Sequence, residues 1–249
     1  MRMAVRPTFI VAICIWLAAI GTSCGPKSQP SEVERSSPGS GSPSAAPPQP
    51  AASPDAGAQA ATSAPKADDT RPVIVTFGDS LTQGVSGKSY PAFLQDLLDE
   101  SGYAYRIDNQ GVSGDTSTDG LARIENVVAA KPALVVLEFG GNDGLRGVPV
   151  ETTRANIDQM LARLKSAHIP VVLAGITLPP NYGPDYIQPF NAIFPSLAHK
   201  YGIRYLPFLL IHVYDKPGMM RPDGIHPTEA GNRIVARDVF DLIKPLLRK

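Results

Sequence analysis

The chain has 249 residues but only two cysteines, one tryptophan, four histidines and no net formal charge. Both cysteines lie near the start, at Cys14 and Cys24, so the rest of the chain has no disulfide framework and no cysteine-based metal site. The 23 basic and 23 acidic side chains balance, so no net field favours nucleic acid as a partner. The histidines fit no helical metal pair, and we therefore predict no metal site.

The N-terminus has the pattern of a secretory leader. Two arginines accompany an uncharged, mostly apolar run over residues 8–20, which small residues follow. The run is shorter than the ~20 residues of a membrane-spanning helix, so a cleaved signal peptide over residues 1–23 is favoured over a permanent anchor. Residues 21–24 (Gly-Thr-Ser-Cys) resemble a bacterial lipobox. We expect an exported protein of the cell envelope, held at the membrane surface by lipidated Cys24; ordinary signal-peptidase cleavage is the alternative.

Residues 24–70 are rich in proline, serine, alanine and glycine and contain almost no large apolar side chain. Such a segment buries too little surface to offset its ordering entropy, which predicts a disordered tether. The remainder, residues 71–249, has the size of one domain.

Short apolar runs alternate with helical patterns in that domain, which predicts an α/β fold with a parallel sheet covered on both faces. Helical apolar spacing occurs around Phe93–Leu98 and Ile157–Leu164, and a last helix is predicted from about Thr228. The predicted strands are residues 73–77, 105–107, 134–139, 171–174 and 204–206.

Polar side chains follow several of these strands, at the edge where open sheets bind ligands. Ser80 comes directly after the first strand, while Asp223 and His226 share one loop before the last helix. Their spacing allows the carboxylate to reach one imidazole nitrogen while the other faces the site, as nucleophilic catalysis by serine requires. Each residue alone has a simpler explanation: a serine after a strand is usually a helix cap, and a lone histidine usually lies at the surface.

Four ordered blocks identify a family. Gly-Asp-Ser-Leu at 78–81, Ser-Gly-Asp-Thr-Ser at 113–117, Gly-Gly-Asn-Asp at 140–143 and Asp-Gly-Ile-His-Pro at 223–227 resemble the SGNH, or GDSL, hydrolases. Longer stretches resemble the bacterial thioesterase I, lysophospholipase and arylesterase branch, and the resemblance covers residues 72–248. It implies a flavodoxin-like, three-layer α/β/α sandwich with a five-stranded parallel sheet.

The resemblance also implies roles for single residues. Ser80 would be the nucleophile, His226 the general base and Asp223 its orienting carboxylate. The oxyanion would bind to the backbone N–H groups of Ser80 and Gly114 and to the Asn142 side chain. This chemistry needs no cofactor. The acidic residues Asp79, Asp115 and Asp143 are explained more simply by capping and by hydrogen bonds that fix loops.

The expected reaction is hydrolysis of lysophospholipids, fatty acyl or aryl esters, or acyl thioesters. Loops 144–149 and 178–186 are predicted to form pocket walls, with Leu145, Val148, Tyr182 and Ile225 as pocket residues. One alternative is removal of acetyl groups from envelope polysaccharide at the same site, because fold and triad do not fix the substrate. Another is a non-catalytic binding lipoprotein, which predicts a damaged site. The oligomeric state is not predicted.

Overall fold

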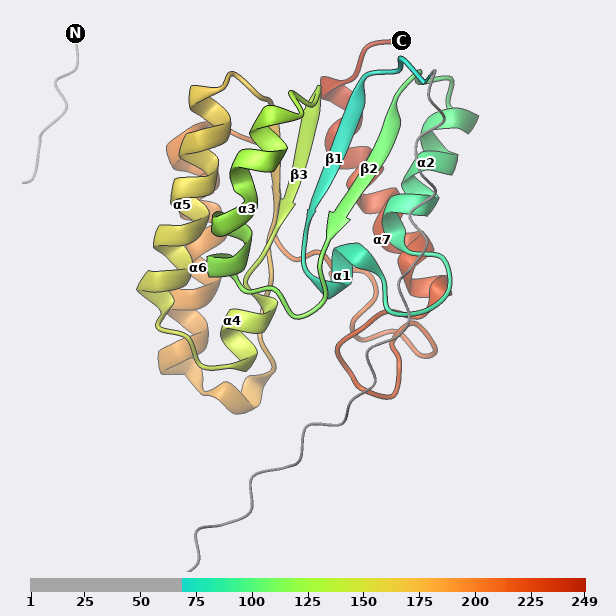
Figure 1. The fold of residues 1–249 in the computed structure, drawn as a ribbon. Helices are drawn as coiled ribbons and strands as arrows, with labels where there is room; N and C mark the ends of the chain where they lie inside the picture. Colours follow the sequence, from blue (N-terminus) through green and yellow to red (C-terminus); the bar gives the residue numbers. More distant parts are fainter. Residues whose placement is uncertain (1–68) are drawn as a thin grey trace, which may run out of the picture. The chain divides into compact units, whose positions relative to one another are not determined.

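The computed structural model describes residues 69–249. The predicted leader, Cys24 and nearly all of the predicted tether lie outside the described residues. The described part contains a sheet of five parallel strands, and each run predicted as a strand overlaps one of them, although the run 105–107 covers only the start of the second (Figure 1). The strands are β1 (Val73–Gly78), β2 (Arg106–Gly111), β3 (Leu134–Glu138), β4 (Val171–Ala174) and β5 (Tyr205–Leu206).

The strand order is β2-β1-β3-β4-β5. Ile74 of β1 lies opposite Ile107 of β2 on one side and Leu134 of β3 on the other. Because all pairs are parallel, the carboxyl ends of the strands meet at one edge, and the chain changes direction across the sheet between β1 and β3. In sheets of this order, that switch point is where ligands bind.

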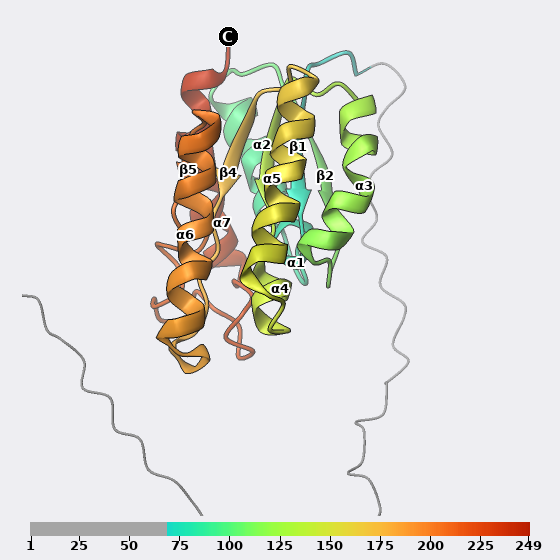
Figure 2. The same ribbon diagram turned by 90° about the vertical axis from the view of Figure 1, so that its left-hand side faces the viewer.

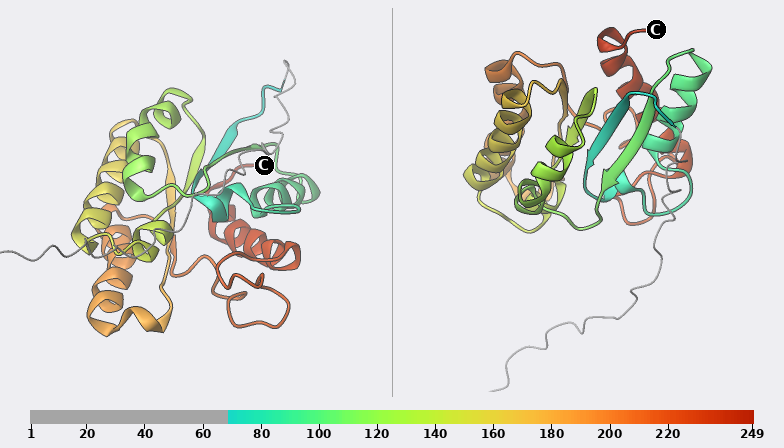
Figure 3. Two further views of the ribbon diagram at one scale, coloured as in Figure 1. Left: turned by 60° about the horizontal axis from the view of Figure 1, so that its bottom comes forward. Right: turned by 45° about the horizontal axis from the view of Figure 1, so that its top comes forward.

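Helices cover both faces of the sheet and produce three layers. On one face α2 and α7 pack against each other, and on the other α3, α5 and α6 lie side by side (Figures 2 and 3). The helices are α1 (Ser80–Gln83), α2 (Tyr90–Glu100), α3 (Ser117–Ala129), α4 (Gly141–Leu145), α5 (Val150–Ser166), α6 (Pro184–Tyr201) and α7 (Glu229–Ile243), with single 3-10 turns η1 (Pro180–Tyr182) and η2 (Lys244–Leu246). The short helices α1 and α4 follow β1 and β3 at the carboxyl edge.

The core lies on both faces of the central strands, which explains their continuous apolar runs. All five residues of β3 are buried, including Glu138, whereas the edge strand β2 is only half-buried. Phe77 of β1 and Phe139 after β3 meet edge to face, with ring centroids 5.0 Å apart. Full burial of such a side chain stabilises the fold by about 1.5–3 kcal/mol.

The helical patterns around Phe93 and Ile157 correspond to α2 and α5. Thr228 caps α7, where its side chain accepts a hydrogen bond from the Gly231 N–H at 3.2 Å. Within residues 69–249 no helix is both long and apolar enough to cross a membrane.

The predicted loop 178–186 differs from the structure. It contains η1 and the first turn of α6, which begins at Pro184. Proline suits a first helical turn, where its missing N–H costs no hydrogen bond. The same helix continues through Pro189 and Pro195, and internal prolines argue against a helix in sequence.

Candidate active site

Ser80 and His226 are 146 residues apart in the chain but in direct contact in the fold. Ser80 begins α1 at the carboxyl end of β1 and is only 8% exposed. His226 lies in the long loop between β5 and α7. The Ser80 Oγ and His226 Nε2 atoms are 2.8 Å apart, a hydrogen-bond distance.

Asp223 is hydrogen-bonded to the other nitrogen of the His226 ring. Its Oδ2 lies 3.1 Å from His226 Nδ1, and its Oδ1 accepts the backbone N–H groups of Ile225 and His226, both at 2.9 Å. Burial would raise the pKa of the Asp223 carboxyl, but these hydrogen bonds outweigh it and lower the pKa to about 2. Asp223 is therefore a carboxylate at neutral pH and can only accept. The proton of a neutral His226 ring then sits on Nδ1, and Nε2 is left to accept from the Ser80 hydroxyl.

Two backbone N–H groups of the predicted oxyanion site are available to a ligand. In the described part of the chain, neither the Ser80 N–H nor the Gly114 N–H donates to a protein acceptor. Gly114 stands in a turn closed by the Asp115 N–H and the Val112 carbonyl at 3.2 Å, and its φ of 86° is one that glycine adopts without strain.

Asn142 lies in α4, which follows β3, and β3 is the neighbour of the strand that precedes Ser80. Its Nδ2 donates to the Asp115 carbonyl at 2.9 Å and to Asp79 Oδ2 at 3.2 Å. The side-chain amide of Asn142 is therefore fixed between the loop that carries Gly114 and Asp79, the residue before Ser80. The structure thus brings the sequence-predicted residues of the β1, β2 and β3 loops to one place.

The three acidic residues to which no catalytic role was given all fix loops. Asp79 caps α1, with Oδ1 accepting the Leu81 N–H at 2.9 Å. Asp143 is fully buried and accepts the Ser117 N–H at 2.8 Å and the Thr153 hydroxyl at 3.1 Å, which ties α4 to α3 and α5.

Arg123, from α3, connects two strand ends and one loop and was not singled out from the sequence. Its Nε pairs with Asp115 at 2.8 Å, Nη1 donates to the Gln110 carbonyl at 2.8 Å, and Nη2 donates to the Gly78 carbonyl at 2.9 Å. The guanidinium also lies 4.3 Å from the Phe77 ring centroid, a cation–π geometry. One side chain therefore fixes the ends of β1 and β2 and the Gly114 loop.

Glu138 is the second residue that sequence reasoning missed. It ends β3, is fully buried, and its Oε2 accepts the Thr82 hydroxyl at 2.9 Å and the Asp79 N–H at 3.3 Å. Burial, together with the Asp79 charge, raises the pKa of Glu138 well above its ordinary value. The only sequence signal is a charged residue at the end of a continuous apolar run.

Three of the four predicted pocket residues lie near one another. The Tyr182 hydroxyl donates to the Leu145 carbonyl at 3.3 Å, and the Tyr186 hydroxyl donates to the Val148 carbonyl at 2.6 Å. Ile225 stands on the His226 loop and is 39% exposed. Their joint role as a pocket stays a prediction.

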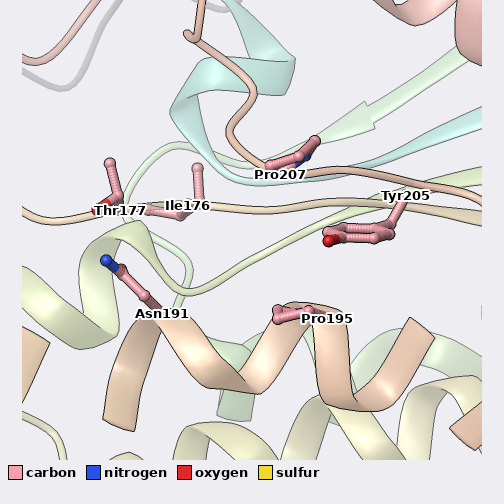
Figure 4. Close-up of a pocket in the computed structure, with 6 residues that line it drawn as sticks. All are labelled: Ile176, Thr177, Asn191, Pro195, Tyr205 and Pro207. Carbon is pink, nitrogen blue, oxygen red and sulfur yellow. The ribbon is translucent and has the colours of Figure 1, made fainter. Parts of the chain in front are cut away.

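A separate pocket of about 230 Å³ lies beyond the carboxyl ends of β4 and β5, against α6 (Figure 4). Neither a triad residue nor a charged side chain lines it. Its lining residues are Ile176, Thr177, Asn191, Pro195, Tyr205 and Pro207.

A second histidine–carboxylate pair lies on the surface. His212 Nδ1 is 3.0 Å from both carboxylate oxygens of Asp238, and the His212 side chain is 64% exposed. Within residues 69–249, no three histidine, cysteine, aspartate or glutamate side chains are grouped so as to hold a metal ion.

Residues 76–234 match the model of the GDSL-like lipase/acylhydrolase family. The chain belongs to this family. It is 40% identical over 178 residues to esterase TesA of Pseudomonas aeruginosa, covering 70% of this chain and 89% of that protein. It is 38% identical over 178 residues to an arylesterase of Vibrio mimicus, with coverage of 70% and 89%.

Solved structures agree. The crystal structure of TesA superposes with a TM-score of 0.67 at 40% identity, covering 70% of this chain and 99% of that chain. AlinE4, a SGNH-hydrolase family esterase, gives a TM-score of 0.59 at 39% identity, with coverage of 72% and 98%. The predicted family, its class of ester-cleaving serine hydrolases and the three-layer fold are confirmed.

Proposed function

We propose that this chain hydrolyses carboxylic esters through an acyl-enzyme on Ser80, with His226 as the general base and Asp223 as its orienting carboxylate. The single observation that carries the proposal is the continuous contact from Ser80 Oγ to His226 Nε2 at 2.8 Å and from His226 Nδ1 to Asp223 Oδ2 at 3.1 Å. This is the arrangement that serine acyl transfer needs.

The reaction follows from these contacts. His226 Nε2 takes the Ser80 proton while Oγ attacks the acyl carbonyl, and the tetrahedral oxygen gains negative charge. The free N–H groups of Ser80 and Gly114 face that charge. Asn142 donates to the same oxygen through the Nδ2 hydrogen that now points to Asp79 Oδ2. This hydrogen is the freer of the two, since the 3.2 Å contact with Asp79 is longer than the 2.9 Å contact with the Asp115 carbonyl. Protonated His226 then releases the alcohol or thiol, and a water molecule repeats the cycle on the acyl-enzyme.

The exposed apolar side chains around the carboxyl edge support an apolar acyl or aryl group in the substrate. Val85, Val112, Leu145 and Ile225 are between 36% and 43% exposed. Val85 follows α1, Val112 follows β2, Leu145 ends α4, and Ile225 precedes His226 in its loop. Contact with an acyl chain would remove their apolar area from water, a gain of about 25 cal/mol per Å². Aryl esters, fatty acyl esters, lysophospholipids and acyl thioesters fit this description.

The first test is Ser80→Ala on a series of p-nitrophenyl esters of increasing acyl length and on lysophosphatidylcholine. We expect kcat/KM to fall by roughly 10⁴-fold or more, since the covalent route is lost. Ser166→Ala, at the exposed end of α5, is the matched control and should keep wild-type activity. Robust hydrolysis by the Ser80 variant would refute the proposal, and activity confined to acetyl esters would favour the polysaccharide deacetylase instead.

We also propose that the enzyme is exported and held at the cell envelope by lipidated Cys24, which the sequence pattern supports. The intact mass of protein extracted from membranes measures this directly. Diacylation should add the mass of the lipid to a chain that begins at Cys24, and Cys24→Ser should release soluble protein. A chain without lipid in the wild type would refute the anchor and leave the esterase proposal untouched.

A further inference from the structure

The reaction described above makes no use of Glu138, although its carboxyl group lies directly behind the nucleophile loop. Glu138 is 0% exposed and Asp79 is 2% exposed, and Glu138 Oε2 accepts the Asp79 backbone N–H at 3.3 Å, so the two carboxyl groups are neighbours in a buried site. A carboxyl–carboxyl hydrogen bond needs a proton on one of its partners. The contacts of the other oxygen atoms show which partner carries it.

Three of the four carboxyl oxygens accept hydrogen bonds. Asp79 Oδ1 accepts the Leu81 N–H at 2.9 Å, and Asp79 Oδ2 accepts from Asn142 Nδ2 at 3.2 Å. Glu138 Oε2 accepts the Thr82 hydroxyl at 2.9 Å and the Asp79 N–H at 3.3 Å. Glu138 Oε1 alone is buried with no donor in the described part of the chain. It is the oxygen left to carry the proton and to donate it to Asp79.

Burial and charge point to the same assignment. Two carboxylates in contact in a dry site cannot both ionise. Burial raises the pKa of Glu138 well above its ordinary value, and it raises that of Asp79 to about 6. The other titratable groups facing the pair are His226, which lowers the pKa of Asp79, Asp143 of α4, which raises it, and Tyr90 of α2, which reaches Glu138 through Thr82.

A glycine at the end of β1 leaves room for the Glu138 carboxyl group. A Cβ atom at Gly78 would clash with the Thr82 hydroxyl and with the Glu138 carboxyl group. Glycine at the end of β1 therefore lets Glu138 reach the Asp79 N–H. In this way β3 contributes its terminal side chain to the turn that holds Ser80.

We propose that Glu138 is a positioning residue for the oxyanion site: it holds a proton at neutral pH and donates it from Oε1 to Asp79. Asp79 then remains an acceptor for the Leu81 N–H, next to Ser80, and for the Asn142 amide. The proton thereby fixes two of the three oxyanion donors without touching the substrate. The catalytic half of this inference rests on the proposed function, whereas the location of the proton does not.

The proton is measured by ¹³C NMR of the full chain labelled with [5-¹³C]glutamate, titrated from about pH 5 to about pH 9. Glu138→Gln identifies the signal by its disappearance. We expect that one signal to stay at the position of a protonated carboxylic acid through neutral pH while the exposed glutamates are ionised. A Glu138 signal already ionised near pH 7 would overturn the proposal, whatever the enzyme's activity.

Two substitutions test the positioning role. Gln at 138 can donate from its amide to Asp79 and accept from Thr82, whereas Met fills a similar volume and does neither. We expect Glu138→Gln to keep kcat within about threefold, and Glu138→Met to lose about tenfold or more in kcat with little change in KM, since the donors act on the transition state.

Equal losses in the two variants, or a loss confined to KM, would contradict the positioning role. If Glu138→Met does not fold, Thr82→Val removes one donor to Oε2 and should lower kcat in the same direction; an unchanged kcat would also contradict the role. If Ser80→Ala proved active, the proposed function would fail, and the NMR titration would still decide where the proton lies.

Discussion

Two acidic sites flank the nucleophile, and their environments are opposite. Asp223 lies in a loop, its side chain is 39% exposed, and N–H donors lower its pKa to about 2. Asp79 and Glu138 are buried at the ends of β1 and β3, and burial raises the pKa of both. The loop site therefore supplies a negative charge for the His226 ring, whereas the buried site retains a proton. The carboxyl groups of two sites close to one serine thus have different tasks because of their hydration and hydrogen bonding.

The largest expected effect comes from removing the charge at the loop site. Asp223→Asn should lower kcat/KM by about 10³-fold, because an amide at this position favours the wrong histidine tautomer. Kinetics with a p-nitrophenyl ester measure it. Asp238→Asn, which removes the partner of the exposed His212, is the control and should have no effect. If Asp223→Asn lowered kcat/KM by less than tenfold, the negative charge of the loop site would not matter for the reaction.

The second effect concerns the amide that the buried site orients. Asn142→Ala should lower kcat by about 10²-fold and change KM little, as removal of an oxyanion donor does. Steady-state kinetics of this variant and of Asn126→Ala, on the exposed side of α3, give the comparison. An increase in KM at constant kcat would instead assign Asn142 to substrate binding.

The smallest effect is on stability and separates the two sites by their response to pH. A raised folded pKa means that the contribution of Glu138 to stability is fully present below its unfolded pKa of about 4.3 and is lost as the pH rises toward the folded value. Gln cannot ionise. The free energy of unfolding of Glu138→Gln should therefore rise relative to wild type above about pH 4.3, by at most about 1.4 kcal/mol per pH unit.

Urea unfolding at several pH values measures this difference. Glu125→Gln replaces an exposed glutamate of α3 and is the control for the loss of a surface carboxylate. Parallel stability curves for wild type and Glu138→Gln would show that Glu138 is not held protonated. Asp223 acts in the opposite sense: its contribution is present above the unfolded pKa of about 3.9 and is lost as the pH falls toward 2.

The sequence predicts the strands and the loops after them because buried parallel strands leave continuous apolar runs and because four motif blocks fall at their ends. Helix α6 was not predicted, since Pro189 and Pro195 oppose helix formation and only tertiary packing accommodates them. The residues named for catalysis could be found because each stands in a motif.

Glu138 and Arg123 could not be found in that way. Their importance depends on partners elsewhere in the chain, which are Thr82 and Asp79 for Glu138 and the carbonyl groups of Gln110 and Gly78 for Arg123. The protonation state of Glu138 is set by burial, which a single charged letter at a strand end does not reveal. The pocket residues depend on side-chain positions in loops, and spacing alone does not determine those.

Arg123 has a consequence for engineering. Because this one side chain anchors the ends of β1 and β2 from α3, it holds the Ser80 turn and the Gly114 loop in place from the inner side of the site, whereas the Val85 and Leu145 side chains are exposed. Substitutions of these exposed apolar side chains should therefore change which ester fits while the chemical step keeps its rate. Libraries aimed at new substrates should vary these exposed side chains and leave Arg123 and the loop of Asp223 and His226 intact.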